Sequence, residues 1–212
     1  MSEFDSVLLA SGGMDSTTLA YKLFREGKRV IPLFLDYGQH CREKEFETLK
    51  EVLPANYTPD IKVIKIGDVY KESNSRMIKE ANLWVDNVVA DDLYLPYRNL
   101  LFLTIAAAFA QSKGIQVIYS AFINSNHAKE IDCSLEFFNK LEALLSDYGS
   151  VKIQMPFRDL TKSEVAKIGV ELGTPIGKTY SCQINSNNHC GVCPNCVDRL
   201  KALNSLFEKV QN

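Results

Sequence analysis

The stretch Val7-Leu8-Leu9-Ala10-Ser11-Gly12-Gly13-Met14-Asp15-Ser16-Thr17-Thr18 decides the fold of this 212-residue chain. Its apolar first part predicts a buried strand, and the residues from Leu19 to Leu23 continue at the spacing of a helix. Gly12 and Gly13 allow a tight turn between strand and helix. Because the first amides of a helix have no internal partner and attract anions, this turn predicts a phosphate site.

The polar residues of the loop indicate which type of phosphate-binding motif it is. Ser11, Ser16 and Thr17 add hydroxyl donors, whereas the Asp15 carboxylate would repel phosphate unless a cation such as Mg²⁺ lies between them. The run lacks the Gly-Lys-Ser/Thr of a P-loop and the Gly-x-Gly-x-x-Gly of a dinucleotide site. It resembles the Ser-Gly-Gly-x-Asp-Ser loop of the PP-loop ATP pyrophosphatases. The simpler alternative is an ordinary strand-to-helix turn capped by Asp15 or Ser16.

Composition excludes several classes of protein. Hydrophobic residues make up 46% and charged residues 24%, as in an ordinary soluble domain, and the net charge of −2 suggests no general nucleic-acid or membrane surface. Acidic Glu3 and Asp5 argue against a signal peptide, and the apolar stretch from Leu100 to Ala110 is too short to span a bilayer. We therefore expect a cytoplasmic protein with reduced cysteines.

Further strands and helices alternate along the chain. Strands are predicted at 30–35, 61–66 and 116–121, and helices at 43–52, 100–113, 134–146, from 161 onward and at 197–210. The alternation predicts an α/β fold with one doubly wound parallel sheet, and the polar alternation of 61–66 places that strand near an edge. Residues 67–95 are interpreted as an insertion with a short helix. Residues 1–178 are expected to form the ATP-binding domain, with 179–212 packed on it.

Polar residues follow the strands where ligands bind. Asp36, Tyr37 and Gln39 come directly after the strand at 30–35, so we expect them beside the first loop, although a polar turn alone would explain them. Arg98 and Asn99 precede the helix at 100–113, which is a good position for an anion or, more simply, for a solvated Arg and a cap.

Thr161 and Glu164 form a predicted capping box at the start of a later helix. Lys162 follows in the first turn, which is the unfavourable end of the helix dipole for a cation. We therefore expect Lys162 to contact a phosphate or a carboxylate.

Four cysteines cluster near the end of the chain as Cys182, Cys190, Cys193 and Cys196, in the pattern C-x7-C-x2-C-x2-C. Four soft thiolates at this spacing suit a closed, tetrahedral, structural Zn²⁺ site. The alternatives are an iron–sulfur cluster, a redox pair or no metal.

The loop at one end and the cysteines at the other resemble the 7-cyano-7-deazaguanine synthase (QueC) family of queuosine biosynthesis. The resemblance covers essentially the whole chain in order. Its supporting segments are 11–18, Asp36-Tyr37-Gly38-Gln39, Pro96 with Arg98-Asn99-Leu100, Asp132-Cys133, 160–164 and Thr179-Tyr180-Ser181-Cys182 with the later cysteines.

The resemblance implies an ATP-dependent ligase that converts 7-carboxy-7-deazaguanine and ammonia into 7-cyano-7-deazaguanine (preQ0), with Mg²⁺ and Zn²⁺ and as a homodimer. It implies catalytic roles for Asp15, Lys162 and Arg98, and substrate binding by Arg98, Asn99 and Asp132. ATP would be held by the loop together with Asp36, Tyr37 and Gln39. The loop residues are Ala10, Ser11, Gly12, Gly13, Met14, Asp15, Ser16, Thr17 and Thr18.

The chain departs from the family pattern at Ser120-Ala121-Phe122 and at Glu130-Ile131. It also has Tyr97 at a position where many members have Gly. These departures motivate one alternative, a paralogue that transfers an adenylylated deazaguanine to a protein or nucleic acid. Another amide-forming or tRNA-sulfurating PP-loop enzyme is a second alternative. A zinc-dependent binding protein with a degenerate loop is a third.

Overall fold

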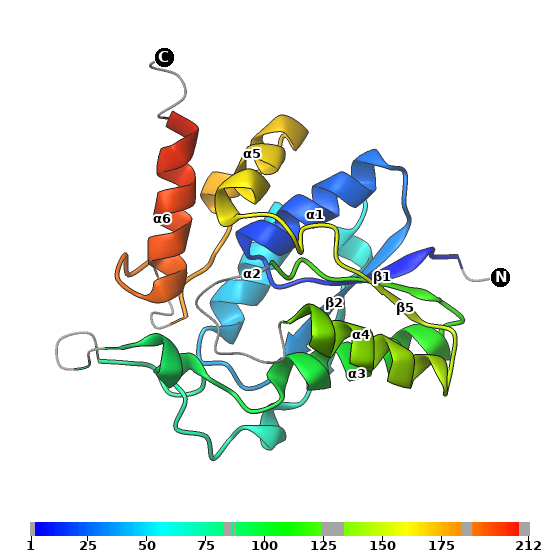
Figure 1. Cartoon of the computed structure of the whole chain (residues 1–212). Coiled ribbons are helices and arrows are strands. Elements are labelled where there is room, and N and C mark those ends of the chain that lie inside the picture. The colour runs from blue at the N-terminus through cyan, green and yellow to red at the C-terminus, as the bar shows by residue number, and fades with distance from the viewer. Residues whose placement is uncertain (1–2, 83–85, 87, 124–133, 184–187, 208–212) are drawn as a thin grey trace.

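The computed structural model describes residues 3–82, 86, 88–123, 134–183 and 188–207. These residues form a five-stranded sheet in the order β3-β2-β1-β4-β5, and every paired strand is parallel (Figure 1). The strands are β1 (Ser6–Leu9), β2 (Val30–Asp36), β3 (Lys62–Lys65), β4 (Val117–Tyr119) and β5 (Lys152–Gln154). The strand order reverses between β1 and β4, which is where ligands bind in such sheets.

Helices cover both faces of the sheet, which confirms the predicted α/β class (Figure 1). Leu8 and Phe34 pack with α1, α2 and α5 on one face, whereas Val7 and Leu33 pack with α3 on the other. The α4 helix lies beside α3, and α6 packs along α5. The helices are α1 (Met14–Arg25), α2 (Arg42–Val52), α3 (Arg98–Ser112), α4 (Leu135–Ser146), α5 (Lys162–Leu172) and α6 (Pro194–Phe207).

The strands have the burial that their sequences predicted. In β2, the residues from Val30 to Leu35 are all buried, as expected of a parallel strand covered on both faces. The β3 strand lies at the edge of the sheet and is mostly exposed, which confirms the position predicted from its alternation.

The helix ends follow local sequence signals. Gly27, with φ of +71°, follows the end of α1, and Thr161 with Glu164 forms the predicted capping box of α5. The α3 helix is preceded by Tyr97, whose φ of 56° is left-handed and uncommon for a residue other than glycine. In the predicted insertion, two short 3-10 turns, Gly67–Val69 and Ala90–Leu93, are the helical segments among the described residues.

One apolar segment, Asp91–Ser112, is long and apolar enough by composition to cross a membrane, with a mean hydropathy of 1.3. Core helices of soluble proteins also meet these criteria. Here Leu103, Ala106 and Ala110 of α3 are fully buried, and α3 packs on β1 and β4. We therefore interpret α3 as a core helix.

Candidate active site and metal centre

A cavity of about 310 Å³ lies at the carboxyl ends of β1, β2 and β4. The loop between β1 and α1 forms one wall, the start of α3 a second, and the segment before the cysteines a third. Of the predicted site residues, the following line it: Ala10, Ser11, Gly13, Met14, Asp15, Ser16, Tyr37, Gln39, Arg98, Asn99 and Lys162.

The loop is held in shape by its own hydroxyl groups. The Ser11 backbone N–H donates to Ser16 Oγ at 3.3 Å, and Ser16 Oγ donates to the Gly13 carbonyl at 3.3 Å. The Gly13 N–H in turn donates to Ser11 Oγ at 3.3 Å. These contacts place backbone amides and two hydroxyls around one turn at a helix N-terminus, which is the arrangement that binds phosphate.

Gly12 is required by the packing of the loop. Its φ is +75°, and a Cβ at this position would lie 2.8 Å from both the Glu45 carbonyl oxygen and the Leu49 nitrogen of α2. Its own carbonyl accepts a hydrogen bond of 3.0 Å from the Tyr180 N–H. The loop is therefore packed closely between α2 and the segment that leads to the cysteines.

Lys162 forms an ion pair with Asp15, which joins the first turns of α5 and α1. The structure thus confirms that Lys162 contacts a carboxylate, as its position in the helix predicted. The other carboxylate oxygen of Asp15, Oδ1, is buried and has no hydrogen-bond partner among the described residues. A buried acceptor without a donor fits a cation, so the residues present suit a divalent ion between Asp15 and phosphate.

The loop after β2 lies beside the first loop, as predicted. Gln39 is buried, its side-chain oxygen accepts from the Tyr37 N–H at 2.9 Å, and its amide donates to the Leu35 carbonyl at 3.3 Å. Tyr37 packs on Phe102, and burial raises its pKa well above the ordinary value. Asp36 accepts from the Gly38 N–H but does not line the cavity.

Arg98 and Asn99, at the start of α3, line the same cavity as the loop between β1 and α1, which is called the phosphate loop below. Arg98 donates to Met77 Sδ at 2.9 Å and to Asn99 Oδ1 at 3.4 Å. Asn99 is buried, so its amide is oriented within this wall.

Several predicted residues lie elsewhere. Thr17 and Thr18 are fully buried beneath the loop, and the Thr18 hydroxyl faces Gly169 of α5. Gly12 contacts α2 and is not part of the cavity lining. Asp132 lies outside the described residues.

Ser181 and Glu45 are among the cavity residues that were given no site role from the sequence. Ser181 lines the cavity, and its Oγ is buried without a hydrogen-bond partner among the described residues. Glu45 of α2 also lines the cavity, and burial raises its pKa from 4.5 to about 7. In the sequence, Glu45 is one of several acidic residues in a charged helix, so no local signal distinguished it.

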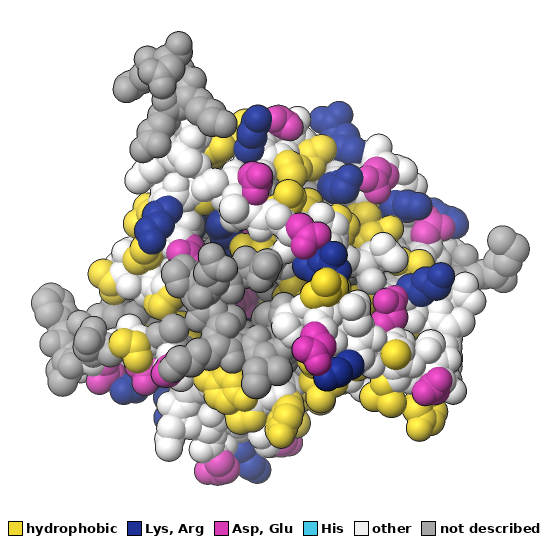
Figure 2. All heavy atoms as spheres, viewed as in Figure 1, with side chains coloured by type: hydrophobic (Ala, Val, Ile, Leu, Met, Phe, Trp, Pro, Cys, Tyr) yellow, Lys and Arg dark blue, Asp and Glu magenta, His cyan; other side chains and the backbone are white. Residues whose placement is uncertain are grey.

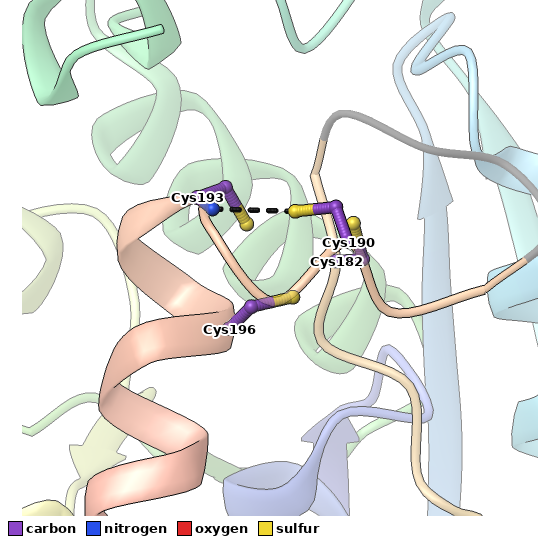
Figure 3. A group of neighbouring side chains, drawn as sticks. All are labelled: Cys182, Cys190, Cys193 and Cys196. Atoms are coloured by element: carbon purple, nitrogen blue, oxygen red, sulfur yellow. Dashed lines mark hydrogen bonds between the residues drawn. The ribbon is translucent and has the colours of Figure 1, made fainter. Parts of the chain in front are cut away.

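The four clustered cysteines converge on one point (Figure 3). Their Sγ atoms all lie within 4.8 Å of one another, and Cys190 Sγ accepts from the Cys193 N–H at 3.2 Å. Cys193 immediately precedes α6 and Cys196 lies in its first turn, where the helix dipole favours thiolates. The donor set and its spacing fit a four-coordinate metal ion.

His189 does not replace one of these ligands. Its Nε2 accepts from the Ser181 N–H at 3.2 Å, and its ring packs on Tyr180. Burial lowers the pKa of His189, consistent with a neutral ring acting as an acceptor.

The cysteine cluster is connected to the phosphate loop through a buried arginine. Arg199 of α6 donates to Thr179 Oγ1 and to the Ile176 carbonyl, both at 2.6 Å. The next residue, Tyr180, donates its N–H to Gly12. The cysteine cluster and the phosphate loop are thus linked through a few hydrogen bonds.

This fold and site define a PP-loop protein, with a Ser-Gly-Gly-x-Asp-Ser turn at the switch point of a parallel sheet. The crystal structure of a 4-thiouridine synthetase–RNA complex with bound ATP has a similar fold, with a TM-score of 0.54 at 16% identity. The match covers 97% of this chain and 53% of that chain.

The chain belongs to the family of the queuosine biosynthesis protein QueC, whose model matches residues 5–207. The 7-cyano-7-deazaguanine synthase of Picrophilus torridus is 36% identical over 208 residues, covering 92% of this chain and 85% of that protein. The enzyme of the same name from Methanospirillum hungatei JF-1 is 30% identical over 214 residues, covering 95% of each.

Proposed function

We propose that this protein uses ATP to convert 7-carboxy-7-deazaguanine and ammonia into 7-cyano-7-deazaguanine. The observation that carries this proposal is a single cavity that joins the phosphate loop to Arg98 and Asn99, in a chain of the QueC family. ATP phosphates at the loop would leave the remainder of the cavity for a flat, carboxylated heterocycle.

In the first step, a carboxylate oxygen of the substrate attacks the α-phosphate of ATP, and the bond to pyrophosphate breaks. Amides and hydroxyls from Ser11 to Ser16 would hold the departing pyrophosphate. Lys162 would neutralise charge that develops there, and Arg98 would hold the substrate carboxylate. Ammonia then attacks the acyl-adenylate to give the amide and AMP.

In the last step, a second ATP activates the amide oxygen, and loss of AMP leaves the nitrile. The same loop and Lys162 would serve both activations, because each displaces pyrophosphate. Tyr37 and Gln39 would border the nucleotide at the end of β2.

Two metal ions belong to this proposal. Mg²⁺ would be held by Asp15 and the phosphates, and it supplies charge neutralisation when bound. Zn²⁺ would be held by Cys182, Cys190, Cys193 and Cys196 in a structural role, because all four ligands are thiolates. An iron–sulfur cluster is the alternative occupant of the same cysteines.

We also propose a cytoplasmic homodimer that binds no nucleic acid directly. The described face in Figure 2 carries basic and acidic side chains interspersed, without a large area of either sign. This agrees with a small-molecule substrate better than with a tRNA-sulfurating activity or with transfer to a protein or nucleic-acid acceptor.

The test is ATP–pyrophosphate exchange that depends on 7-carboxy-7-deazaguanine. Lys162→Met should slow exchange by about 10²–10³-fold, because it removes a charge at the leaving group. Lys167→Met is the matched control, since Lys167 is on the same helix but 60% exposed and paired with Glu171. Exchange without the deazaguanine, or equal rates in the two variants, would contradict the proposal.

A further inference from the structure

Glu45 is a carboxylate in the cavity that the adenylylation step does not use. It lies in the first turn of α2, directly behind the phosphate loop, since its own carbonyl limits the space at Gly12. Its side chain lines the same cavity as Arg98 and Asn99.

The contacts of Glu45 orient its carboxylate without neutralising it. Gln39 Nε2 donates to Glu45 Oε2 at 2.9 Å, and Cys41 Sγ donates to Oε1 at 3.4 Å. Gln39 and Cys41 are both buried, so these two hydrogen bonds fix the position of the Glu45 carboxylate. Among the described residues, no Lys or Arg lies within ion-pair distance of it.

A carboxylate oxygen can accept more than one hydrogen bond, and each Glu45 oxygen has one of these donors, so both oxygens keep acceptor capacity. The ionisable groups that act on Glu45 are Arg98 of α3, which favours its charged form, and the neighbouring Cys41, Tyr37 and Tyr180. Desolvation has the larger effect and raises the pKa of Glu45 to about 7, so the protonated and ionised forms are both accessible near neutral pH.

We propose that Glu45 binds the ammonia nucleophile and accepts its proton in amide formation. This inference rests on the proposed function. Ammonia is mostly ammonium at neutral pH, and a half-buried carboxylate held by two neutral donors is a suitable partner for that small cation. Glu45 first takes one proton from the bound ammonium and releases it to solvent. The ammonia nitrogen then forms its bond to the acyl carbon, the bond from that carbon to the AMP oxygen breaks, AMP leaves with that electron pair, and Glu45 takes a second proton from the nitrogen. The proton then passes to solvent.

The test separates activation of the acid from attack by nitrogen. Glu45→Gln keeps the shape of the side chain, and Glu47→Gln on the same helix is the control, since the Glu47 side chain is 68% exposed. Each variant is assayed for deazaguanine-dependent ATP–pyrophosphate exchange, for ammonia-dependent amide and nitrile formation across pH, and for hydroxamate formation with hydroxylamine. Hydroxylamine is largely unprotonated at neutral pH and needs no base before it attacks.

We expect Glu45→Gln to keep exchange and hydroxamate formation while its ammonia-dependent rate falls by at least about a hundredfold. The fall should shrink at high pH, where free ammonia is abundant. Three results would overturn the inference: an unchanged ammonia rate, equal losses with both nucleophiles, or lost exchange, which would place Glu45 on ATP or the heterocycle. Absent exchange in the unaltered protein would overturn the proposed function and this inference with it.

Discussion

The packing of the phosphate loop against α2 predicts a steep penalty for Gly12→Ala. The left-handed backbone at Gly12 costs an alanine about 1–2 kcal/mol. The added Cβ also meets two backbone atoms of α2 at 2.8 Å, and overpacking of this kind costs about 1–3 kcal/mol. Together, these effects should lower the free energy of unfolding by roughly 2–5 kcal/mol.

Substitutions at two other glycines separate the cost of the left-handed backbone from the cost of overpacking. Gly173 has the same φ of +75° but nothing within 4 Å of a Cβ, so Gly173→Ala should cost only the backbone share, about 1–2 kcal/mol. Gly177 has neither a left-handed φ nor a nearby atom, so Gly177→Ala should be neutral or stabilising by about 0.4–1 kcal/mol. Urea unfolding of the three variants, prepared under the same metal conditions and followed by circular dichroism, gives these values. A Gly12→Ala penalty no larger than that of Gly173→Ala would refute the reasoning.

Three further predictions concern other positions. Tyr97→Gly should raise the free energy of unfolding by about 1 kcal/mol, because it removes a left-handed non-glycine residue that is 72% exposed. A loss of stability in urea unfolding would show instead that the tyrosine side chain makes stabilising contacts. Glu45 holds its proton more tightly when folded, since its pKa rises from 4.5 to about 7, so wild-type stability should fall as pH rises through that window. Glu45→Gln should gain up to about 3 kcal/mol relative to wild type between pH 5 and pH 8 in the ligand-free protein, and a pH-independent difference would contradict the burial argument. Cys196→Ser should bind less than one zinc ion per chain and lose more than about 4 kcal/mol of stability, measured by metal analysis and unfolding; full zinc content would exclude Cys196 as a ligand.

The parts of the fold that were predictable carry their signals locally. The strand, the glycine turn and the helix of residues 7–23 follow from adjacent residues, and so do the capping box at Thr161 and the cysteine spacing. Lys162 was notable because a cation in the first turn of a helix conflicts with the dipole, and the Asp15 carboxylate resolves that conflict.

The parts that escaped prediction depend on tertiary packing. The β5 strand has only three residues, Lys152–Gln154, of which one is buried, so it has no periodicity to detect. Glu45 is indistinguishable from its exposed neighbours in sequence, because only the approach of α2 to the phosphate loop brings it to the cavity. The Arg199 link between the cysteine cluster and the loop likewise joins residues that no local pattern relates.

The proposed reaction carries a carboxylate through to a nitrile in one cavity. The most direct measurement is mass spectrometry of products after incubation with ATP, Mg²⁺, ¹⁵N-labelled ammonium and 7-carboxy-7-deazaguanine. We expect ¹⁵N-labelled 7-cyano-7-deazaguanine together with AMP. Accumulation of the amide or the adenylate as the final product, or no turnover, would contradict it and would indicate that this site serves a different acceptor.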